Sequence, residues 1–197
     1  MTLPQARQSF VGVTASMAAA AIGVHPYQSR AQAWRIATGR EAFERNSAME
    51  WGTYYEVFAV AQYEAEMGEI CTDTGEAQRF VVSSRYPWLG CTPDGFPMGG
   101  GLIECKCPQS MYSEPQAYHV PQMQVAMAVT GRSWDDYVVW TPDAFAVWRC
   151  YWDEAYWEWM LPYLYAFWRC IRDDRQPPRF KRGRKPTQPK VCIERIV

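Results

Sequence analysis

The stretch of residues 92–108 constrains this 197-residue chain more than any other. It reads Thr-Pro-Asp-Gly-Phe, then a loop with three consecutive glycines, then Leu-Ile-Glu-Cys-Lys-Cys-Pro. Glycines let the chain reverse its direction, so Asp94 can return beside a strand that carries Glu104 and Lys106. Because side chains alternate along a strand, the glutamate and the lysine share one face, and the isoleucine and both cysteines share the other. We therefore expect two carboxylates and an ammonium on one small patch.

Such a patch suits a hard divalent cation, because Mg²⁺ takes oxygen ligands and keeps several of its waters. The alternative is a solvated face, which is the commoner role of an acid and a lysine two residues apart on a strand. The apolar and cysteine positions of this strand indicate burial, and Asp94 lies at a defined break between a proline and a glycine. The chain also carries an internal control. Thr141-Pro142-Asp143 repeats the first three residues without a Glu-x-Lys strand after it, which indicates an ordinary turn.

Composition limits the class of protein. A chain of 197 residues with 48% hydrophobic and 15% aromatic residues is long and apolar enough for one domain with its own core. The net charge of −1 does not indicate nucleic-acid binding, so a local basic surface would have to bind phosphates. Seven cysteines without regular spacing favour a reducing compartment, and no apolar run is long enough to cross a bilayer. We expect a cytoplasmic enzyme, and His25 and His119 are too few for a histidine-rich zinc site.

Helices are expected in the first third of the chain. The segment Val13–Ser16 and the alanine run after it predict an N-cap and a short helix that Gly23 ends. Hydroxyls at a helix N-terminus suit a phosphate, and a plain cap is the alternative. A second helix is expected over residues 28–42 and a third over residues 48–68. The third is apolar nearly all round, so we expect it to be buried, and Glu56 within it then needs a salt bridge or a metal.

The rest of the chain alternates strands and helices. Strands are expected over residues 78–84, 88–92 and 102–107, a hairpin over residues 134–151, and helices over residues 115–130 and 153–172. We expect Pro162 to interrupt the last helix, whose aromatic residues suit core packing, a subunit contact or base stacking. This order predicts an α/β fold with a mixed central β-sheet flanked by helices.

A change of composition after Asp174 predicts a domain over residues 1–178 and a basic C-terminal tail over residues 179–197. The tail gathers six basic residues among prolines and a glycine: Arg179, Lys181, Arg182, Arg184, Lys185 and Lys190. Such a run is either solvated or binds phosphate groups.

Pro-Asp-Gly, a short gap and Glu-x-Lys form the signature of the PD-(D/E)xK nucleases. The longer form here resembles the bacteriophage lambda exonuclease group, the viral alkaline exonucleases. Three further segments resemble that group in the same order: Thr-Ala-Ser at residues 14–16, Trp-Gly-x-x-Tyr-Glu ending at Glu56, and His-Val-Pro-Gln at residues 119–122. The resemblance implies a restriction-endonuclease-like core.

The resemblance also implies the chemistry of the site. Asp94 and Glu104 would bind Mg²⁺, with Mn²⁺ as a substitute. Glu56 and the main-chain carbonyl of Cys105 would complete the ligands of two ions. Lys106 would orient or deprotonate the attacking water and offset charge on the transition state.

Positions around these ligands are assigned by the same resemblance. Gln122 would hold the catalytic lysine or the water, although a core amide that caps a carbonyl is the alternative. Ser16, with Thr92 and Arg7, would bind the 5′-phosphate of the DNA end. The group also offers an arginine to this phosphate after Lys-Cys-Pro, but residues 109–112 of this chain read Gln-Ser-Met-Tyr. We therefore expect a differently built phosphate pocket or a weaker dependence on the 5′-phosphate.

The implied function is Mg²⁺-dependent digestion of one strand of linear double-stranded DNA, from 5′ to 3′, in phage-type homologous recombination. The family forms a homotrimeric ring around DNA and works with a single-strand annealing protein, so we expect a phage or prophage protein in a bacterial cytoplasm. A related PD-(D/E)xK endonuclease is one alternative. A catalytically inactive DNA-binding module is the other, and the complete set of Asp94, Glu104 and Lys106 argues against it.

Overall fold

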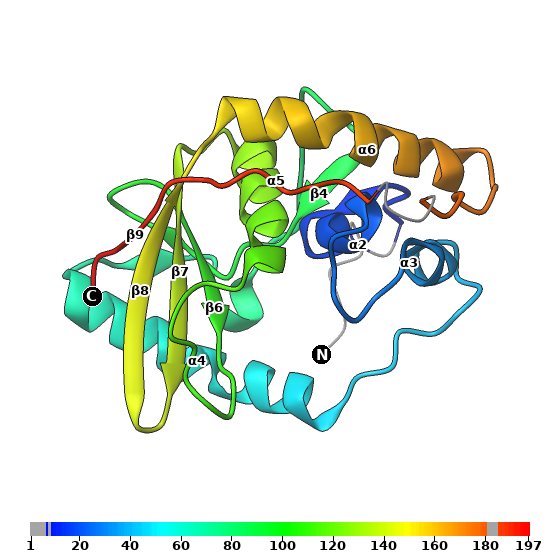
Figure 1. Cartoon of the computed structure of the whole chain (residues 1–197). Coiled ribbons are helices and arrows are strands. Elements are labelled where there is room, and N and C mark those ends of the chain that lie inside the picture. The colour runs from blue at the N-terminus through cyan, green and yellow to red at the C-terminus, as the bar shows by residue number, and fades with distance from the viewer. Residues whose placement is uncertain (1–6, 8, 181–184) are drawn as a thin grey trace.

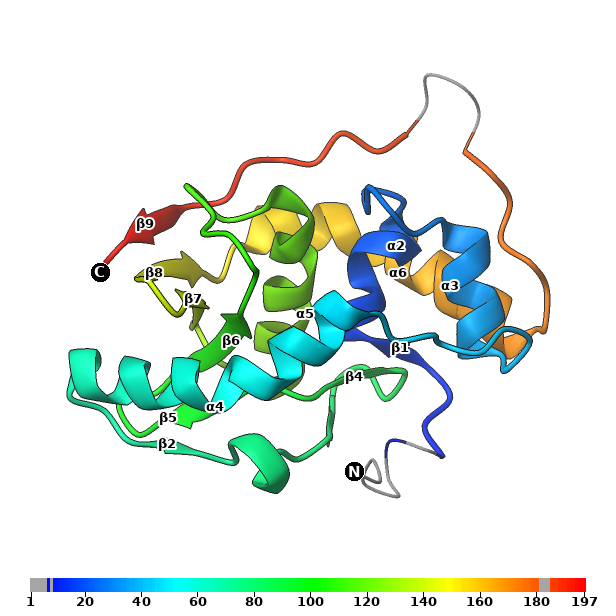
Figure 2. The same ribbon diagram turned by 90° about the horizontal axis from the view of Figure 1, so that it is seen from below.

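The computed structural model describes residues 7, 9–180 and 185–197. Within them the strands form three sheets with helices on both sides, as predicted for a mixed α/β fold (Figures 1 and 2). The first sheet joins β1 (Val13–Thr14), β4 (Leu89–Cys91) and β3 (Val81–Val82), and the second joins β2 (Cys71–Thr72) and β5 (Phe96–Pro97). The third sheet has the order β6 (Leu102–Lys106), β7 (Trp134–Thr141), β8 (Ala144–Tyr151) and β9 (Ile193–Arg195). Strands β6 and β7 are parallel, and the other pairs of this sheet are antiparallel.

The helices are α2 (Ala18–Ile22), α3 (Arg30–Ala37), α4 (Ser47–Met67), α5 (Val120–Thr130) and α6 (Glu154–Arg172), with short 3₁₀ turns at Ala15–Met17, Gly75–Ala77 and Ala117–His119. Helices α4 and α5 pack on strands β6 and β7 of the third sheet, and α2 packs against α3, α5 and α6. One core packs α2, α5 and α6 against Leu102, and the other packs α4 against Ile103 and Cys105. Alternation along β6 therefore separates two cores, and the side chains divide between the faces as predicted.

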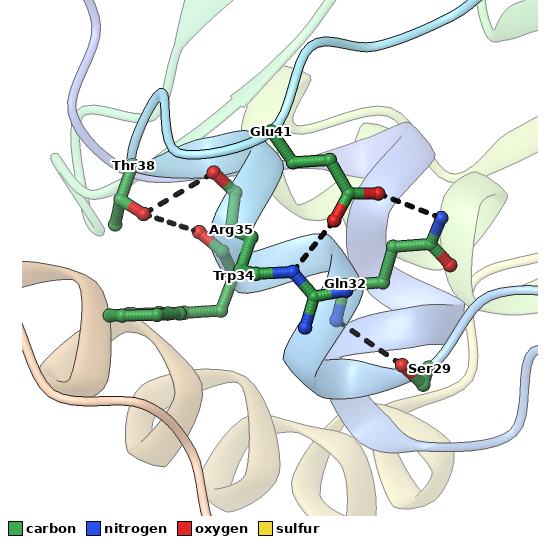
Figure 3. Close-up of polar contacts among 6 residues, drawn as sticks. All are labelled: Ser29, Gln32, Trp34, Arg35, Thr38 and Glu41. Atoms are coloured by element: carbon green, nitrogen blue, oxygen red, sulfur yellow. Dashed lines mark hydrogen bonds and ion pairs between the residues drawn. The ribbon is translucent and has the colours of Figure 1, made fainter.

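Helices α2 and α3 differ in how they begin. The N-cap expected within residues 13–16 is not formed, because neither Thr14 before the 3₁₀ turn nor Met17 before α2 makes a side-chain cap hydrogen bond. Helix α2 ends at Gly23, whose φ of 85° is the left-handed conformation that favours glycine. Helix α3 is shorter than the predicted 28–42. It begins after Ser29, whose hydroxyl accepts a hydrogen bond from the backbone N–H of Gln32 (3.2 Å; Figure 3). After its end the chain turns back, so that Glu41 accepts hydrogen bonds from Arg35 (2.6 Å) and Gln32 (3.1 Å).

The prediction that α4 is buried nearly all round is wrong. Its buried residues are Ala59, Val60 and Tyr63, which lie in the second half of the helix and pack toward the third sheet. On its outer side Tyr54 is 66% exposed, Val57 61% and Phe58 48%. These three residues are called the exposed α4 face below. Phe58 stacks on Trp140 of β7 with 6.0 Å between ring centroids, so the sheet covers this face only in part.

A buried ionic cluster fixes α4 to the third sheet. The hydroxyl of Tyr63 donates a hydrogen bond to Asp136 Oδ2 (2.7 Å) on β7. The guanidinium of Arg149 on β8 binds both oxygens of the same carboxylate at 2.8 Å and lies 3.8 Å from the ring centroid of Trp134. Asp136 is fully buried, so this pairing satisfies a charge that water cannot reach. The cluster holds the helix that carries Glu56 in a fixed place.

The hairpin of β7 and β8 forms as predicted, with its turn at Pro142 and Asp143. Helix α6 continues through Pro162, so the predicted interruption is wrong, and Trp157 and Phe167 pack into the core. Strand β9 pairs with β8, so residues 193–195 of the expected tail belong to the sheet. Residues 181–184 of that tail lie outside the described residues, and the boundary at residue 178 stays a prediction. Of the helices in the described chain, none combines the length and apolar character that crossing a bilayer requires.

Candidate active site

Asp94 lies beside β6, as the glycine loop predicted, although it occupies the turn before β5 rather than a strand. Its backbone N–H donates to the carbonyl of Ile103 (3.2 Å), and its Oδ2 accepts from the backbone N–H of Cys105 (2.7 Å). A Cβ on Gly95 would lie 2.9 Å from Thr74 Cγ2 and 3.0 Å from Ile103 Cδ1. Glycine at this position therefore permits the close approach that brings the aspartate to β6.

Most of the predicted site residues line one pocket of about 190 Å³. Its lining includes Arg7, Ser16, Gln78, Thr92, Asp94, Glu104 and Gln122. They come from segments far apart in the sequence: the N-terminal turn, the residues before β3, the loop after β4, strand β6 and helix α5. The fold thus brings Asp94 and Glu104 to the same cavity as the phosphate-binding candidates, whereas Glu56, Cys105 and Lys106 are not among its lining residues.

The carboxylates of the site repel one another. Burial raises the pKa of Asp94 well above its ordinary value, and the negative charges of Glu104 and Glu56 raise it further. Burial and the charge of Glu104 likewise raise the pKa of Glu56. Lys106 opposes these shifts, and its ammonium forms an ion pair with Glu104. The site therefore holds more negative charge than its lysine offsets.

Lys106 stays protonated in this setting. Burial lowers its pKa, but the carboxylates of Glu104 and Asp94 outweigh that effect and raise the pKa above the ordinary value.

Gln78 is a site residue that the sequence reasoning missed. Its Nε2 donates to Glu56 Oε1 (2.6 Å) and to Asp94 Oδ1 (3.2 Å), so one amide joins two candidate metal ligands. These partners lie 22 and 16 residues away in the sequence, and no local pattern marks the glutamine. Glu56 therefore pairs with an amide, and within the described residues it forms no salt bridge with an arginine.

The donor set fits a divalent cation. Among the described residues no three Asp, Glu, His or Cys side chains form a ready cluster for a metal ion. Glu104 is paired with Lys106, and Glu56 is paired with Gln78. Asp94 and Glu104 nevertheless face one pocket, and the charges of Glu104 and Glu56 raise the pKa of Asp94, a repulsion that an oxygen-seeking cation between the carboxylates would relieve.

The two glutamines of α5 have different environments. Gln124 is fully buried, donates to the carbonyl of Tyr151 (2.8 Å) and accepts from the backbone N–H of Asp153 (3.1 Å). It is the core amide that ties the end of β8 to α6. Gln122 lines the pocket instead, beside the carboxylates.

The phosphate-binding candidates are neighbours. Arg7 Nη1 lies 3.5 Å from Thr92 Oγ1, to which it donates, and Ser16 Oγ lies 3.3 Å from Thr14 Oγ1. Ser16 is exposed, and burial lowers the pKa of Arg7. A guanidinium and two hydroxyls therefore border the pocket on the side of β1.

Comparison with known proteins agrees with this geometry. Residues 5–133 match the family described as the YqaJ-like viral recombinase domain. The alkaline exonuclease LHK-Exo from Laribacter hongkongensis is similar in structure, with a TM-score of 0.72 and 28% identity over 85% of this chain and 91% of that chain. Its complex with dAMP gives a TM-score of 0.70 and 27% identity, covering 84% of this chain and 90% of that chain.

A phage-related exonuclease from Haemophilus somnus 129PT shares the fold, with a TM-score of 0.51 and 14% identity over 70% of this chain and 71% of that chain. No curated protein sequence matches the chain. The family match covers well over half of the sequence, and the alkaline exonuclease matches nearly the whole fold. The chain therefore belongs to the YqaJ-like viral recombinase family and is a nuclease of the lambda-exonuclease-like type, as its motifs predicted.

Proposed function

We propose that this nuclease is a Mg²⁺-dependent exonuclease that digests one strand of linear double-stranded DNA, from 5′ to 3′, during phage-type recombination. One observation carries the proposal: Asp94 and Glu104 line the same pocket as Ser16, Thr92 and Arg7. A cleavage site and a terminal-phosphate site within one small cavity suit an enzyme that works from a DNA end. The similarity to an alkaline exonuclease, whose structure is also known with dAMP, supports the same activity.

Asp94 and Glu104 would hold the metal, with Glu56 as a third carboxylate and the Cys105 carbonyl as a further oxygen. Mg²⁺ or Mn²⁺ in this position would supply an activated water and neutralise charge on the scissile phosphate. Gln78 holds two of these carboxylates in place, and the backbone N–H of Cys105 holds the aspartate. The protein thus fixes its ligands through hydrogen bonds made before a cation arrives.

Lys106 and Gln122 act on the reacting groups. The protonated lysine, held by Glu104, offsets the negative charge that builds on the phosphorane-like transition state. The amide of Gln122 orients the attacking water or the lysine from the α5 side of the pocket. Arg7, Ser16 and Thr92 bind the terminal 5′-phosphate and so set the register of the strand.

The test compares single variants on end-labelled linear duplex DNA with Mg²⁺. Asp94→Asn, Glu104→Gln and Lys106→Met should each reduce the rate by about 10³-fold or more, equivalent to about 4 kcal/mol. Asp143→Asn, in the second Thr-Pro-Asp segment, is the matched control and should keep the parental rate. Variants of the first three positions with near-parental activity would refute the assignment.

Substrate choice separates the alternatives. An exonuclease of this kind leaves closed circular duplex intact, whereas a related endonuclease cuts it. Label released first from the 5′ end, and faster with a 5′-phosphate than without one, supports the proposed polarity and phosphate site. Label released first from the 3′ end would contradict both.

We also propose that the protein forms a homotrimer and works with a single-strand annealing protein, as the resemblance implies. The exposed α4 face supports self-association, because Tyr54, Val57 and Phe58 leave an apolar surface on the helix that carries Glu56. Sedimentation equilibrium should give three times the chain mass for the parent and a smaller species for Phe58→Ser. A monomeric parent at micromolar concentration would overturn this part of the proposal.

A further inference from the structure

We propose that an aromatic cluster beside the active site stacks an unpaired base of the DNA strand being digested. The aromatic cluster consists of His25, Tyr27, Tyr118 and His119. The inference rests on the proposed nuclease function. It adds that part of the bound substrate is single-stranded, and it names the surface that binds this part.

The aromatic cluster has closely packed rings, and one of them is left exposed to solvent. The ring of Tyr118 lies 5.1 Å from that of His25, 6.1 Å from that of Tyr27 and 4.2 Å from that of His119, between centroids. His25 Nδ1 accepts hydrogen bonds from the backbone N–H groups of Tyr27 (3.1 Å) and Gln28 (2.9 Å), which fix its ring. Tyr27 is 83% exposed, the most exposed of the large apolar and aromatic side chains in the described residues. A large ring held on a preorganised support, yet left to solvent, offers a face for stacking.

Its position places it next to the reacting groups. His119 Nδ1 lies 2.7 Å from the hydroxyl of Tyr137, and Tyr137 is the partner of Glu104 in the pairing of β7 with β6. His119 also precedes α5, the helix that carries Gln122 into the pocket. Burial raises the pKa of Tyr118, and the ammonium of Lys106 is near enough to oppose that rise. A strand in the pocket thus has this surface as its neighbour.

The chain segment that reaches the aromatic cluster carries two exposed lysines. Gln188 Nε2 donates to the carbonyl of Ala117 (2.7 Å), which holds the C-terminal segment against the turn that carries Tyr118. Lys185 and Lys190, both exposed, lie three and two residues from Gln188 in that segment. An exposed aromatic face and nearby lysines in the sequence match the chemistry of single-stranded nucleic acid, in which bases stack and phosphates pair with cations. Bases inside a duplex already stack on their neighbours on both faces, so the occupant that we propose is an unpaired nucleotide.

The first experiment measures binding of a fluorescein-labelled single-stranded 12-mer by anisotropy in EDTA, where no cleavage occurs. Tyr27→Ala should weaken binding about tenfold, whereas Tyr27→Phe, which keeps the ring, should bind like the parent. Tyr165→Ala is the matched control, because Tyr165 is also an exposed tyrosine (44%) but lies on α6. Equal affinity of Tyr27→Ala and the parent would overturn the inference.

The second experiment places one abasic nucleotide at successive positions of the digested strand of a linear duplex. The parent should lose about tenfold in rate at one position, and Tyr27→Ala should lose nothing further there. Equal losses in both proteins at every position would refute stacking by the aromatic cluster while leaving the nuclease proposal intact. A parent that neither binds nor cleaves DNA would overturn both proposals.

Discussion

Replacing Gln78 by alanine removes the amide that joins two of the carboxylates at the proposed metal site. Without its hydrogen bonds at 2.6 Å and 3.2 Å, the side chains of Glu56 and Asp94 repel each other with nothing between them. The ligands then lose their fixed geometry, although each keeps its charge. Gln78 therefore acts as a positioning residue.

The size of the effect follows from those two contacts. A hydrogen bond to a charged group contributes about 1.5–3 kcal/mol, and the longer bond to Asp94 is the weaker of the two. Because Gln78 is half-buried and water can replace part of its role, we expect a total near the lower end, about 2 kcal/mol. At about 1.4 kcal/mol per factor of ten, this corresponds to a fall of about 30-fold in kcat/KM.

The assay measures initial rates on 5′-labelled linear duplex over a series of Mg²⁺ concentrations. Gln78→Ala should also require more Mg²⁺ for half-maximal rate, as loss of a group that orients metal ligands typically does. Gln62→Ala is the matched control, because the amide of Gln62 on α4 accepts from Trp140 Nε1 (2.8 Å) and has no part in the site. Activity of Gln78→Ala within twofold of the parent, at every Mg²⁺ concentration, would refute the reasoning.

Three further predictions concern the metal, the buried ion pair and the thiols. Mg²⁺ at about 100 times its Kd should add about 2.7 kcal/mol to the free energy of unfolding of the parent, which raises its Tm by about 5–10 °C. The same Mg²⁺ concentration should raise the Tm of Asp94→Asn by less than about 2 °C, and differential scanning fluorimetry can measure both shifts. Arg149→Met leaves the buried charge of Asp136 without its cation, so urea unfolding should show a loss of about 3 kcal/mol, and a loss below about 1 kcal/mol would contradict the pairing. A thiol-reactive dye should label Cys192 rapidly in the folded protein, and the six buried cysteines only after denaturation; two or more fast thiols would contradict the fold.

The part of the site near β6 could be predicted because its constraints are local. Glycines 99–101 allow the turn, and the alternation of a strand puts Glu104 and Lys106 on one face. Gly95 permits the close approach of Asp94. Each of these requirements is met by residues within a few positions of one another, so the sequence displays them together.

Other features depend on contacts between residues that are far apart in the sequence. The apolar pattern of α4 cannot say which of its sides another element covers, so the exposed α4 face was expected to be buried. Gln78 reaches its partners only after the fold brings α4 and the residues before β5 together. Pro162 removes one hydrogen bond from α6, but the packing of Leu164 and Phe167 into the core keeps the helix continuous.

Strand β6 carries the ion pair of Glu104 and Lys106, our proposed catalytic pair, on one side and the core residues Ile103 and Cys105 on the other. If β6 slipped by one residue against β7, the side chains of Glu104 and Lys106 would point toward the apolar core, and hydrophobic side chains would point into the pocket. Inserting or deleting a single residue between Leu102 and Lys106 would thus abolish folding and chemistry together. The length of this segment is consequently as strict a requirement as the identity of its charged residues.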